Sequence, residues 1–144
     1  MRVVVLVGLP GSGKSTYLER MGAVALSSDA VRRLLADDET DQSIHDRVFE
    51  TIRYLLHHRL AIGRPITYID ATNLVPEERR PYIAIAKSYG CEVEAVFFDV
   101  PVEICRERNS RRNRVVPEEA MAKMALKLIP PDVTEGFDRV LRVQ

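Results

Sequence analysis

The chain of 144 residues lacks the features that mark secreted and membrane proteins. It has only two cysteines, Cys91 and Cys105, whose spacing fits neither a metal-ligand motif nor a disulfide framework. No apolar run approaches the ~18 residues that a membrane-spanning helix needs, and the N-terminus does not have the pattern of a secretory signal peptide. We therefore expect a soluble cytoplasmic protein, or one domain of a longer chain.

An excess of one sign of charge is also missing. Lys and Arg total 21 residues and Asp and Glu total 21, so the formal net charge at neutral pH is zero. Proteins that bind duplex DNA usually carry a basic excess, so a nucleic-acid partner would have to be held by a local basic patch. The length and the hydrophobic content of 46% suit a single domain that spans residues 1–144.

The most informative segment that is present runs from Gly8 to Thr16. It reads GLPGSGKST and matches the phosphate-binding loop pattern G-x-x-x-x-G-K-[ST] at every fixed position. An apolar, strand-like run precedes it, and the residues after it are compatible with a helix. In this context the glycines let backbone N–H groups surround phosphate oxygens at a helix N-terminus. We predict a nucleoside triphosphate site formed by Gly8, Gly11, Ser12, Gly13, Lys14, Ser15 and Thr16.

Two side chains of this loop have expected roles of their own. Lys14 would reach the β- and γ-phosphates, and the hydroxyl group of Ser15 would be a ligand of Mg²⁺. The alternative interpretation is a tight turn between a strand and a helix that is rich in glycine for packing reasons alone.

Along the rest of the chain, strand-like and helical segments alternate. Strands are predicted at residues 3–7, 23–27, 66–70, 93–98 and 139–143, with helical patterns between them. Such alternation favours an α/β phosphate-loop fold with a mostly parallel five-stranded sheet and helices on both of its faces.

Asp29 and Arg32 favour a kinase over other phosphate-loop proteins. The chain lacks the Asn/Thr-Lys-x-Asp motif with which GTPases read their base. Asp29 follows the second predicted strand, where a phosphoryl acceptor would lie beside the phosphate loop, and Arg32 shares its helix face. We expect Asp29 to accept the proton of an attacking hydroxyl and Arg32 to hold a phosphate of the acceptor or of the transition state. Alternatively, Asp29 caps the helix and Arg32 is a surface charge.

An arginine-rich segment follows the fourth predicted strand. It holds five arginines within nine residues: Arg106, Arg108, Arg111, Arg112 and Arg114. We expect a lid at about residues 106–117 that closes over polyphosphate and neutralises charge as the phosphoryl group moves. The alternative is an ordinary solvated helix face.

Asp70 ends the third predicted strand in the sequence Asp-Ala-Thr-Asn. An acidic group at that position can hold a water of the Mg²⁺ shell or orient the acceptor, so Asp70 joins Ser15 as a candidate metal-site residue. Alternatively, Asp70 only forms a turn and Asn73 caps the helix that follows.

Together these segments resemble the polynucleotide 5′-hydroxyl kinases of phage and bacterial nucleic-acid end-healing systems. The matching segments are, in order, Gly8 to Thr16, Ser28-Asp29-Ala30-Val31-Arg32, Asp70-Ala71-Thr72-Asn73, and Arg108-Asn109-Ser110-Arg111-Arg112 followed by Val116-Pro117. The likeness covers essentially the whole chain. Many unrelated enzymes share the phosphate loop, whereas the combination of the other three segments is much more specific.

The resemblance implies a reaction and a role for each matching residue. ATP would donate its γ-phosphoryl group to the 5′-hydroxyl of a DNA or RNA end, with Asp29 as general base. Arg32 would contact the first phosphate of the acceptor strand. Lys14 and Arg112 would stabilise the transferring group, and Arg108 would help to hold the donor nucleotide.

Two alternatives to a polynucleotide kinase stay open. The same fold serves kinases of small metabolites, nucleosides and antibiotics. A nucleotide-binding module without catalytic activity is the third interpretation. The sequence does not predict an oligomeric state.

Overall fold

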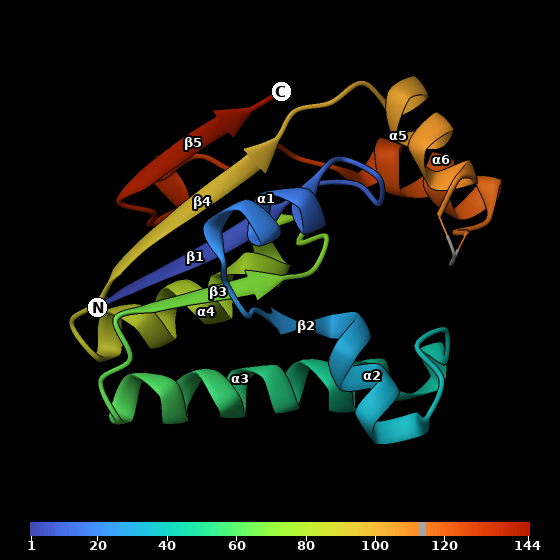
Figure 1. The fold of residues 1–144 in the computed structure, drawn as a ribbon. Coiled ribbons are helices and arrows are strands. Elements are labelled where there is room, and N and C mark those ends of the chain that lie inside the picture. The colour runs from blue at the N-terminus through green and yellow to red at the C-terminus, as the bar shows by residue number, and fades with distance from the viewer. Residues whose placement is uncertain (113–114) are drawn as a thin grey trace.

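The computed structural model describes residues 1–112 and 115–144 (Figure 1). Its strands are β1 (Arg2–Val7), β2 (Leu26–Ser27), β3 (Ile66–Asp70), β4 (Glu92–Phe98) and β5 (Arg139–Val143). Its helices are α1 (Lys14–Met21), α2 (Ser28–Ala36), α3 (His45–Ala61), α4 (Pro76–Ser88), α5 (Val102–Ser110) and α6 (Glu118–Lys127), with 3₁₀ turns η1 (Gln42–Ile44) and η2 (Val133–Glu135). Arg114 of the predicted lid lies outside the described residues.

The described strands form one sheet in the order β2-β3-β1-β4-β5, and every pairing is parallel. The predicted α/β phosphate-loop fold is therefore confirmed. β1 lies in the centre, between β3 and β4, so the chain winds outward from it in both directions. Ligands of such sheets bind beyond the carboxyl ends of the strands at this point of divergence, which is where β1 runs into the phosphate loop.

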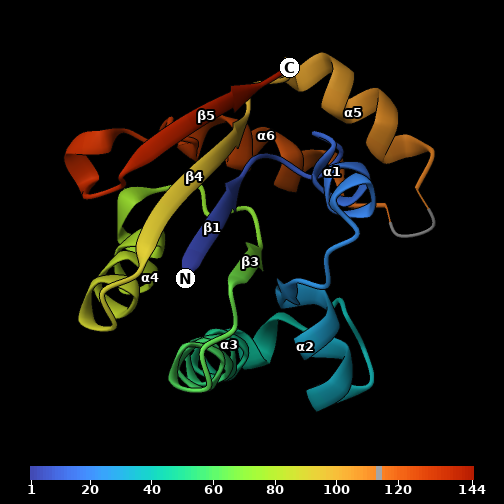
Figure 2. The same cartoon turned by 60° about the vertical axis from the view of Figure 1, so that its left-hand side comes forward.

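Helices cover both faces of the sheet, as the two views show (Figures 1 and 2). Side chains of a strand alternate between faces. Val3, Val5 and Val7 accordingly pack with α3 and α4, whereas Val4 and Leu6 pack with Leu18 of α1. Burial on both faces explains why β1 is a continuous apolar run rather than an alternating one.

The second strand is shorter than predicted. Of the five residues at 23–27, only Leu26–Ser27 pair with the sheet, beside Ile69 and Asp70 of β3. The Ala23 N–H instead donates to the carbonyl of Leu18, within the turn that ends α1. The short pairing is still sufficient to bring the start of α2 next to the end of β3.

A separate apolar cluster attaches α5 and α6 to the phosphate loop. Its buried members are Leu9 of the loop, Leu74, Cys105 of α5 and Met121 of α6. The arginine-rich segment therefore begins on a helix that is packed against the loop. Among the described residues, none of the helices combines the length and apolarity needed to cross a bilayer.

Candidate active site

A cleft of about 1150 Å³ opens beside the phosphate loop at the carboxyl ends of the central strands. Of the site residues predicted from the sequence, it is lined by Gly11, Ser12, Gly13, Lys14, Ser15, Thr16, Asp29, Arg32, Asp70, Arg108 and Arg112. Gly8, the first residue of the loop, is the exception and does not line the cleft. A Cβ there would be 2.6 Å from Ser12 Oγ and 3.0 Å from the Cβ of Phe98. Gly8 thus allows the close packing of the loop without facing the cleft.

The loop backbone needs glycine at two positions. Gly11 has φ +82° and Gly13 has φ +107°, in the left-handed region that side chains disfavour. A Cβ on Gly11 would also lie 2.6 Å from the carbonyl oxygen of Cys105 in α5. Gly13 is the N-cap of α1, whose first N–H groups have no intrahelical acceptor. The loop therefore presents a helix N-terminus suited to anions.

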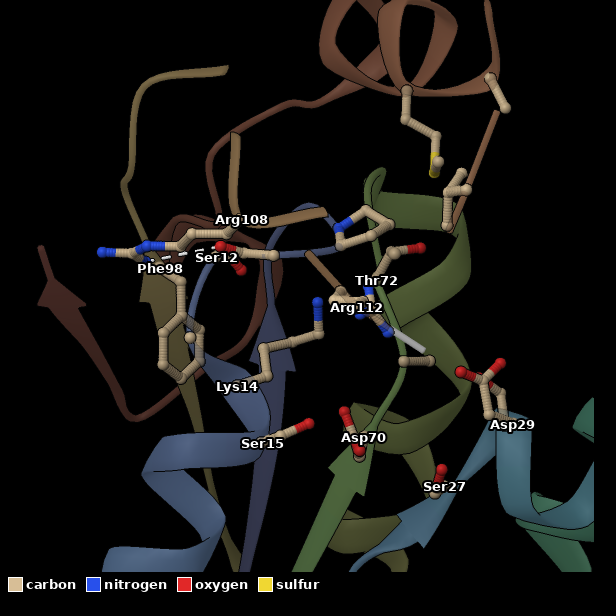
Figure 3. Close-up of a pocket in the computed structure, with 18 of the residues that line it drawn as sticks. Ser12, Lys14, Ser15, Ser27, Asp29, Asp70, Thr72, Phe98, Arg108 and Arg112 are labelled. Carbon is tan, nitrogen blue, oxygen red and sulfur yellow. Dashed lines mark hydrogen bonds between the residues drawn. The ribbon is translucent and has the colours of Figure 1, made fainter. Parts of the chain in front are cut away.

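Lys14 lies at the centre of the cleft (Figure 3). Its Nζ donates to the carbonyl oxygens of Gly8 at 2.8 Å and Leu9 at 2.9 Å. Burial lowers the pKa of Lys14 to about 8, although the Asp70 carboxylate acts in the opposite direction. The ammonium group is consequently charged at neutral pH and is held where a phosphate would meet it.

Asp70 and Ser15 fit a Mg²⁺ ion. Both lie in the lower part of the cleft in Figure 3, with Asp70 at the end of β3. Burial raises the pKa of the Asp70 carboxyl, and the ammonium of Lys14 opposes that shift. A carboxylate and a hydroxyl are hard oxygen donors, and Mg²⁺ keeps several waters and binds phosphate oxygens as well. The described residues contain no cluster of three or more His, Cys, Asp and Glu that could hold a metal ion.

The start of α2 forms the opposite wall of the cleft. Ser27 caps this helix, because its Oγ accepts from the Ala30 N–H at 3.3 Å. The helix-cap alternative for Asp29 is therefore wrong. Asp29 instead lies in the first turn and lines the cleft, and Asp70 stands between it and Ser15 in the view of Figure 3.

Arg32 is buried, with a relative exposure of 4%. The surface-charge alternative is therefore wrong as well. Its Nη1 lies 3.5 Å from Asp29 Oδ1, and its Nε has no hydrogen-bond partner among the described residues. A buried guanidinium with an unused donor is costly unless something satisfies it. Because Arg32 lines the cleft, an anionic ligand bound there would supply the missing acceptor.

The structure divides the arginine-rich segment into two groups. Arg106 forms an ion pair with Glu118 at 2.7 Å, and Arg111 forms one with Glu107 at 2.8 Å. These two arginines follow the solvated-face alternative, so the expectation that the whole run faces polyphosphate needs correction. Glu107 lies in α5, within the arginine-rich segment itself, whereas Glu118 is the first residue of α6.

Among the described arginines of this segment, Arg108 and Arg112 line the cleft. Arg108 Nη1 donates to the Gly11 carbonyl at 3.4 Å, drawn as a dashed line in Figure 3. Arg112 lies close enough to Lys14 for its charge to lower the pKa of that ammonium group. The described part of the lid thus contributes two guanidinium groups beside the phosphate loop.

Sequence reasoning missed how the loop after β3 is held. The Gly8 N–H donates to Thr72 O at 3.0 Å, and Asn73 Nδ2 donates to Leu6 O at 2.7 Å. Asn73, at φ +49°, ties the loop to the end of β1, while Val75 is the N-cap of α4. The alternative in which Asn73 caps that helix is therefore wrong. These bonds fix Asp70 and Thr72 relative to the phosphate loop.

The anchor of this loop is Arg79, a fully buried side chain. Its Nε and Nη2 donate to both carboxylate oxygens of Glu135 at 2.9 Å, and its Nη1 donates to the carbonyls of Asn73 and Ile129 at 2.9 Å. In the sequence Arg79 is one charge in the run Glu-Glu-Arg-Arg, and its partner is 56 positions away. No local pattern could have found it.

The cleft also contains residues that sequence reasoning did not select. On the side of α2 it is extended by Thr40, Gln42, His45 and Phe49. Near the lid it is lined by Val115, Val116, Pro117, Ala120, Lys123 and Met124. The cleft therefore extends from the phosphate loop both toward α2 and toward α6.

Comparison with known proteins identifies the family. The sequence profile of the family described as "AAA domain" matches residues 3–131, so the chain belongs to that family. A curated relative, the transcription factor bHLH140 of Arabidopsis thaliana, is 28% identical over 146 residues. That match covers 96% of this chain and 15% of the relative, so the chain spans about a seventh of the relative's length.

Solved structures show that the fold is that of the phosphate-loop kinases. A chain of the Pnkp1/Rnl/Hen1 RNA repair complex superposes with a TM-score of 0.74 at 24% identity, over 88% of this chain and 43% of that one. The Mycobacterium tuberculosis APS kinase CysC, in complex with AMPPNP and APS, superposes with a TM-score of 0.60 at 21% identity. In that case the match covers 98% of this chain and 87% of the other.

Proposed function

We propose that this protein transfers the γ-phosphoryl group of ATP to a hydroxyl group, and that the acceptor is the 5′-hydroxyl of a DNA or RNA strand. The observation that carries the proposal is the placement of the Asp29–Arg32 pair in the same cleft as the phosphate loop. The kinase-type fold and the nucleotide complex of the APS kinase support ATP as donor. The likeness to the RNA repair complex supports a nucleic-acid acceptor.

In this proposal the donor side neutralises phosphate charge. Lys14 and Arg112 stabilise the transferring phosphoryl group, and Arg108 holds the donor nucleotide near the loop. Mg²⁺, held with Ser15 and Asp70, would withdraw charge from the β- and γ-phosphate oxygens. Phosphoryl transfer spreads negative charge over those oxygens, so positioned cations are its principal catalysts. Residues 1–144 form one kinase domain, with residues at about 106–117 as its lid.

On the acceptor side Asp29 performs the proton transfer. A bond forms between the acceptor oxygen and the γ-phosphorus while the bond from that phosphorus to the β–γ bridging oxygen breaks, leaving ADP. The hydroxyl proton passes to the Asp29 carboxylate. Because the carboxylate lies in the first turn of α2, it is carried by a rigid element rather than by a loop.

Arg32 supports a polynucleotide over a neutral metabolite. The hydroxyl at a 5′ end is followed by a phosphodiester one nucleoside away, and that phosphate would satisfy the unpaired Nε of Arg32. Contact with only one or two phosphates does not need the basic surface of a duplex-binding protein. The zero net charge of the chain is therefore compatible with this acceptor.

The test is transfer of label from γ-³²P-ATP with Mg²⁺ to a 5′-hydroxyl oligonucleotide, beside the same oligonucleotide already 5′-phosphorylated. We expect label on the first and none on the second. A nucleoside 3′-phosphate and the plain nucleoside form a second pair, in which only the former offers Arg32 a phosphate. We expect the 3′-phosphate compound to be the better acceptor by tenfold or more, roughly the value of a charged hydrogen bond.

A kinase of a small anionic metabolite is the second candidate, and the similarity to the APS kinase favours it. It predicts that ATP binds, that oligonucleotides remain unlabelled, and that a screen of anionic hydroxyl compounds yields an acceptor. The Asp29–Arg32 pair opposes the third interpretation, a nucleotide-binding module that does not catalyse transfer.

A further inference from the structure

Asn109 is a buried amide inside the arginine-rich segment. Its relative exposure is 3%, although its neighbours Arg108 and Ser110 are exposed. Its Nδ2 donates to the carbonyl oxygen of Val116 at 2.8 Å, and its Oδ1 accepts from the N–H of the same residue at 3.1 Å. Both polar atoms of the Asn109 side chain therefore bond to the backbone of Val116, seven positions further along the chain.

This two-point contact joins two anchored parts of the molecule. Asn109 lies in the last turn of α5, one turn after Cys105, which packs against the phosphate loop. Val116 belongs to the same apolar cluster and lines the cleft just before α6. The side chain thus fixes the distance between the end of α5 and the start of α6.

Arg112 follows the end of α5, next to this contact. Its backbone N–H donates to the carbonyl of Asn109 at 3.1 Å, so its main chain is held by the same residue that binds Val116. The Arg112 side chain then lies beside Lys14 in the cleft (Figure 3). An arginine side chain has many rotamers. Because the main chain of Arg112 is fixed, less conformational entropy is lost when its guanidinium group is positioned for the reaction.

We propose that Asn109 is a positioning residue, which holds the Arg112 guanidinium over the phosphate loop for phosphoryl transfer. The inference rests on the proposed function, because it assumes that Arg112 acts on the transferring group. Asn109 touches neither donor nor acceptor in this account, and its effect on the reaction passes through Arg112. Displacement of a catalytic group by about 1 Å can reduce a rate on the order of 100-fold, so a lost anchor should be measurable.

The experiment measures affinity for ADP alone and for ADP with aluminium fluoride, a mimic of the transferring phosphoryl group, in the presence of Mg²⁺. No acceptor is needed, so the outcome does not depend on which hydroxyl the enzyme uses. We expect Asn109→Ala to weaken the fluoroaluminate complex on the order of tenfold while changing ADP affinity less than about twofold. In a double mutant with Arg112→Ala, Asn109→Ala should cause no further loss, because coupled residues are not additive.

Ser110→Ala and Arg111→Ala are the matched controls. Ser110 is exposed and its Oγ donates locally to Glu107 O, while Arg111 pairs with Glu107 on the surface. Both should leave the fluoroaluminate affinity within about twofold of wild type. If Asn109→Ala does not fold, Asn109→Leu keeps a similar side-chain volume and removes both hydrogen bonds to Val116, and the same comparison applies to it.

Several outcomes would overturn the inference. One is an equal loss of ADP and fluoroaluminate affinity, which indicates general damage to the loop. Another is a double mutant in which the two losses multiply, which shows that Asn109 does not act through Arg112. If fluoroaluminate does not tighten ADP binding even in the wild type, the proposed phosphoryl transfer fails together with this inference.

Discussion

Two arginines in the described part of the chain, Arg79 and Arg32, are buried but have very different hydrogen-bond partners. Arg79, behind the loop that follows β3, makes four hydrogen bonds, two of which form a bidentate ion pair with Glu135. Arg32, on the acceptor wall, has an ion-pair distance of 3.5 Å to Asp29 and an Nε without a partner among the described residues. Since buried polar groups are normally hydrogen-bonded, the first arrangement indicates a structural residue and the second indicates a ligand site.

The same contrast separates the two halves of the cleft. On the donor side the loop is held by the bonds from Lys14 to Gly8 and Leu9 and by the bond from Gly8 to Thr72. On the acceptor side, a strand of only two residues leads into α2 and its incompletely satisfied arginine. The part of the cleft at the phosphate loop is therefore held by hydrogen bonds, whereas the part at α2 contains a buried donor that no described residue satisfies.

The largest effect on stability should come from Arg79. Replacing it with Ala leaves the Glu135 carboxylate without its partner and the carbonyls of Asn73 and Ile129 without their donor. We expect the free energy of unfolding to fall by about 3–5 kcal/mol in urea denaturation. Arg80→Ala, at the exposed neighbouring position, should change it by less than about 0.5 kcal/mol. A loss below about 1 kcal/mol for Arg79→Ala would contradict the structural role.

Arg32 should show the opposite behaviour. Arg32→Gln removes an unsatisfied buried charge, so we expect the free energy of unfolding to change by less than about 1 kcal/mol. The KM for a 5′-hydroxyl oligonucleotide should rise about 10- to 100-fold, since a hydrogen bond to a charged group contributes about 1.5–3 kcal/mol. Steady-state label transfer measures it, with Arg33→Gln at the exposed neighbouring position as control. An unchanged KM would remove Arg32 from the acceptor site.

The smallest effect concerns the charge of Lys14. Burial lowers its pKa to about 8, so above that pH the empty protein loses the ammonium proton. Bound phosphate favours the protonated form. At a pH half a unit above this pKa, nucleotide binding should therefore take up about three-quarters of a proton. Calorimetry of ADP binding in buffers of different ionisation enthalpy measures that uptake. In Lys14→Arg, whose guanidinium stays charged, the uptake should disappear, and an unchanged value would assign it to another group.

Local patterns in the sequence predicted the parts of this structure that depend on local spacing. The phosphate loop, the alternation of strands and helices, the position of Asp29 shortly after β2 and that of Asp70 at the end of β3 were all predictable in this way. The arrangement of the strands around a central β1 then brought Asp29 and Asp70 to the same cleft as Lys14.

Burial and long-range partners were not predictable from those patterns. Arg32 looked like a surface residue under one interpretation, because its burial depends on the tertiary structure around α2. Arg106 looked like part of a lid, but Glu118 of the following helix pairs with it. In both cases tertiary packing rather than sequence spacing decides the outcome.

We propose that Asp29 accepts the proton of the acceptor hydroxyl and contributes nothing to ATP binding. The most direct measurement compares the wild type with Asp29→Asn in two assays, ATP affinity by calorimetry and single-turnover label transfer to a 5′-hydroxyl oligonucleotide. General-base catalysis contributes about 10²–10⁴-fold, so transfer should fall by that factor while ATP affinity stays within about twofold. Transfer at the wild-type rate would contradict the account, because Asp29 would then not be the base.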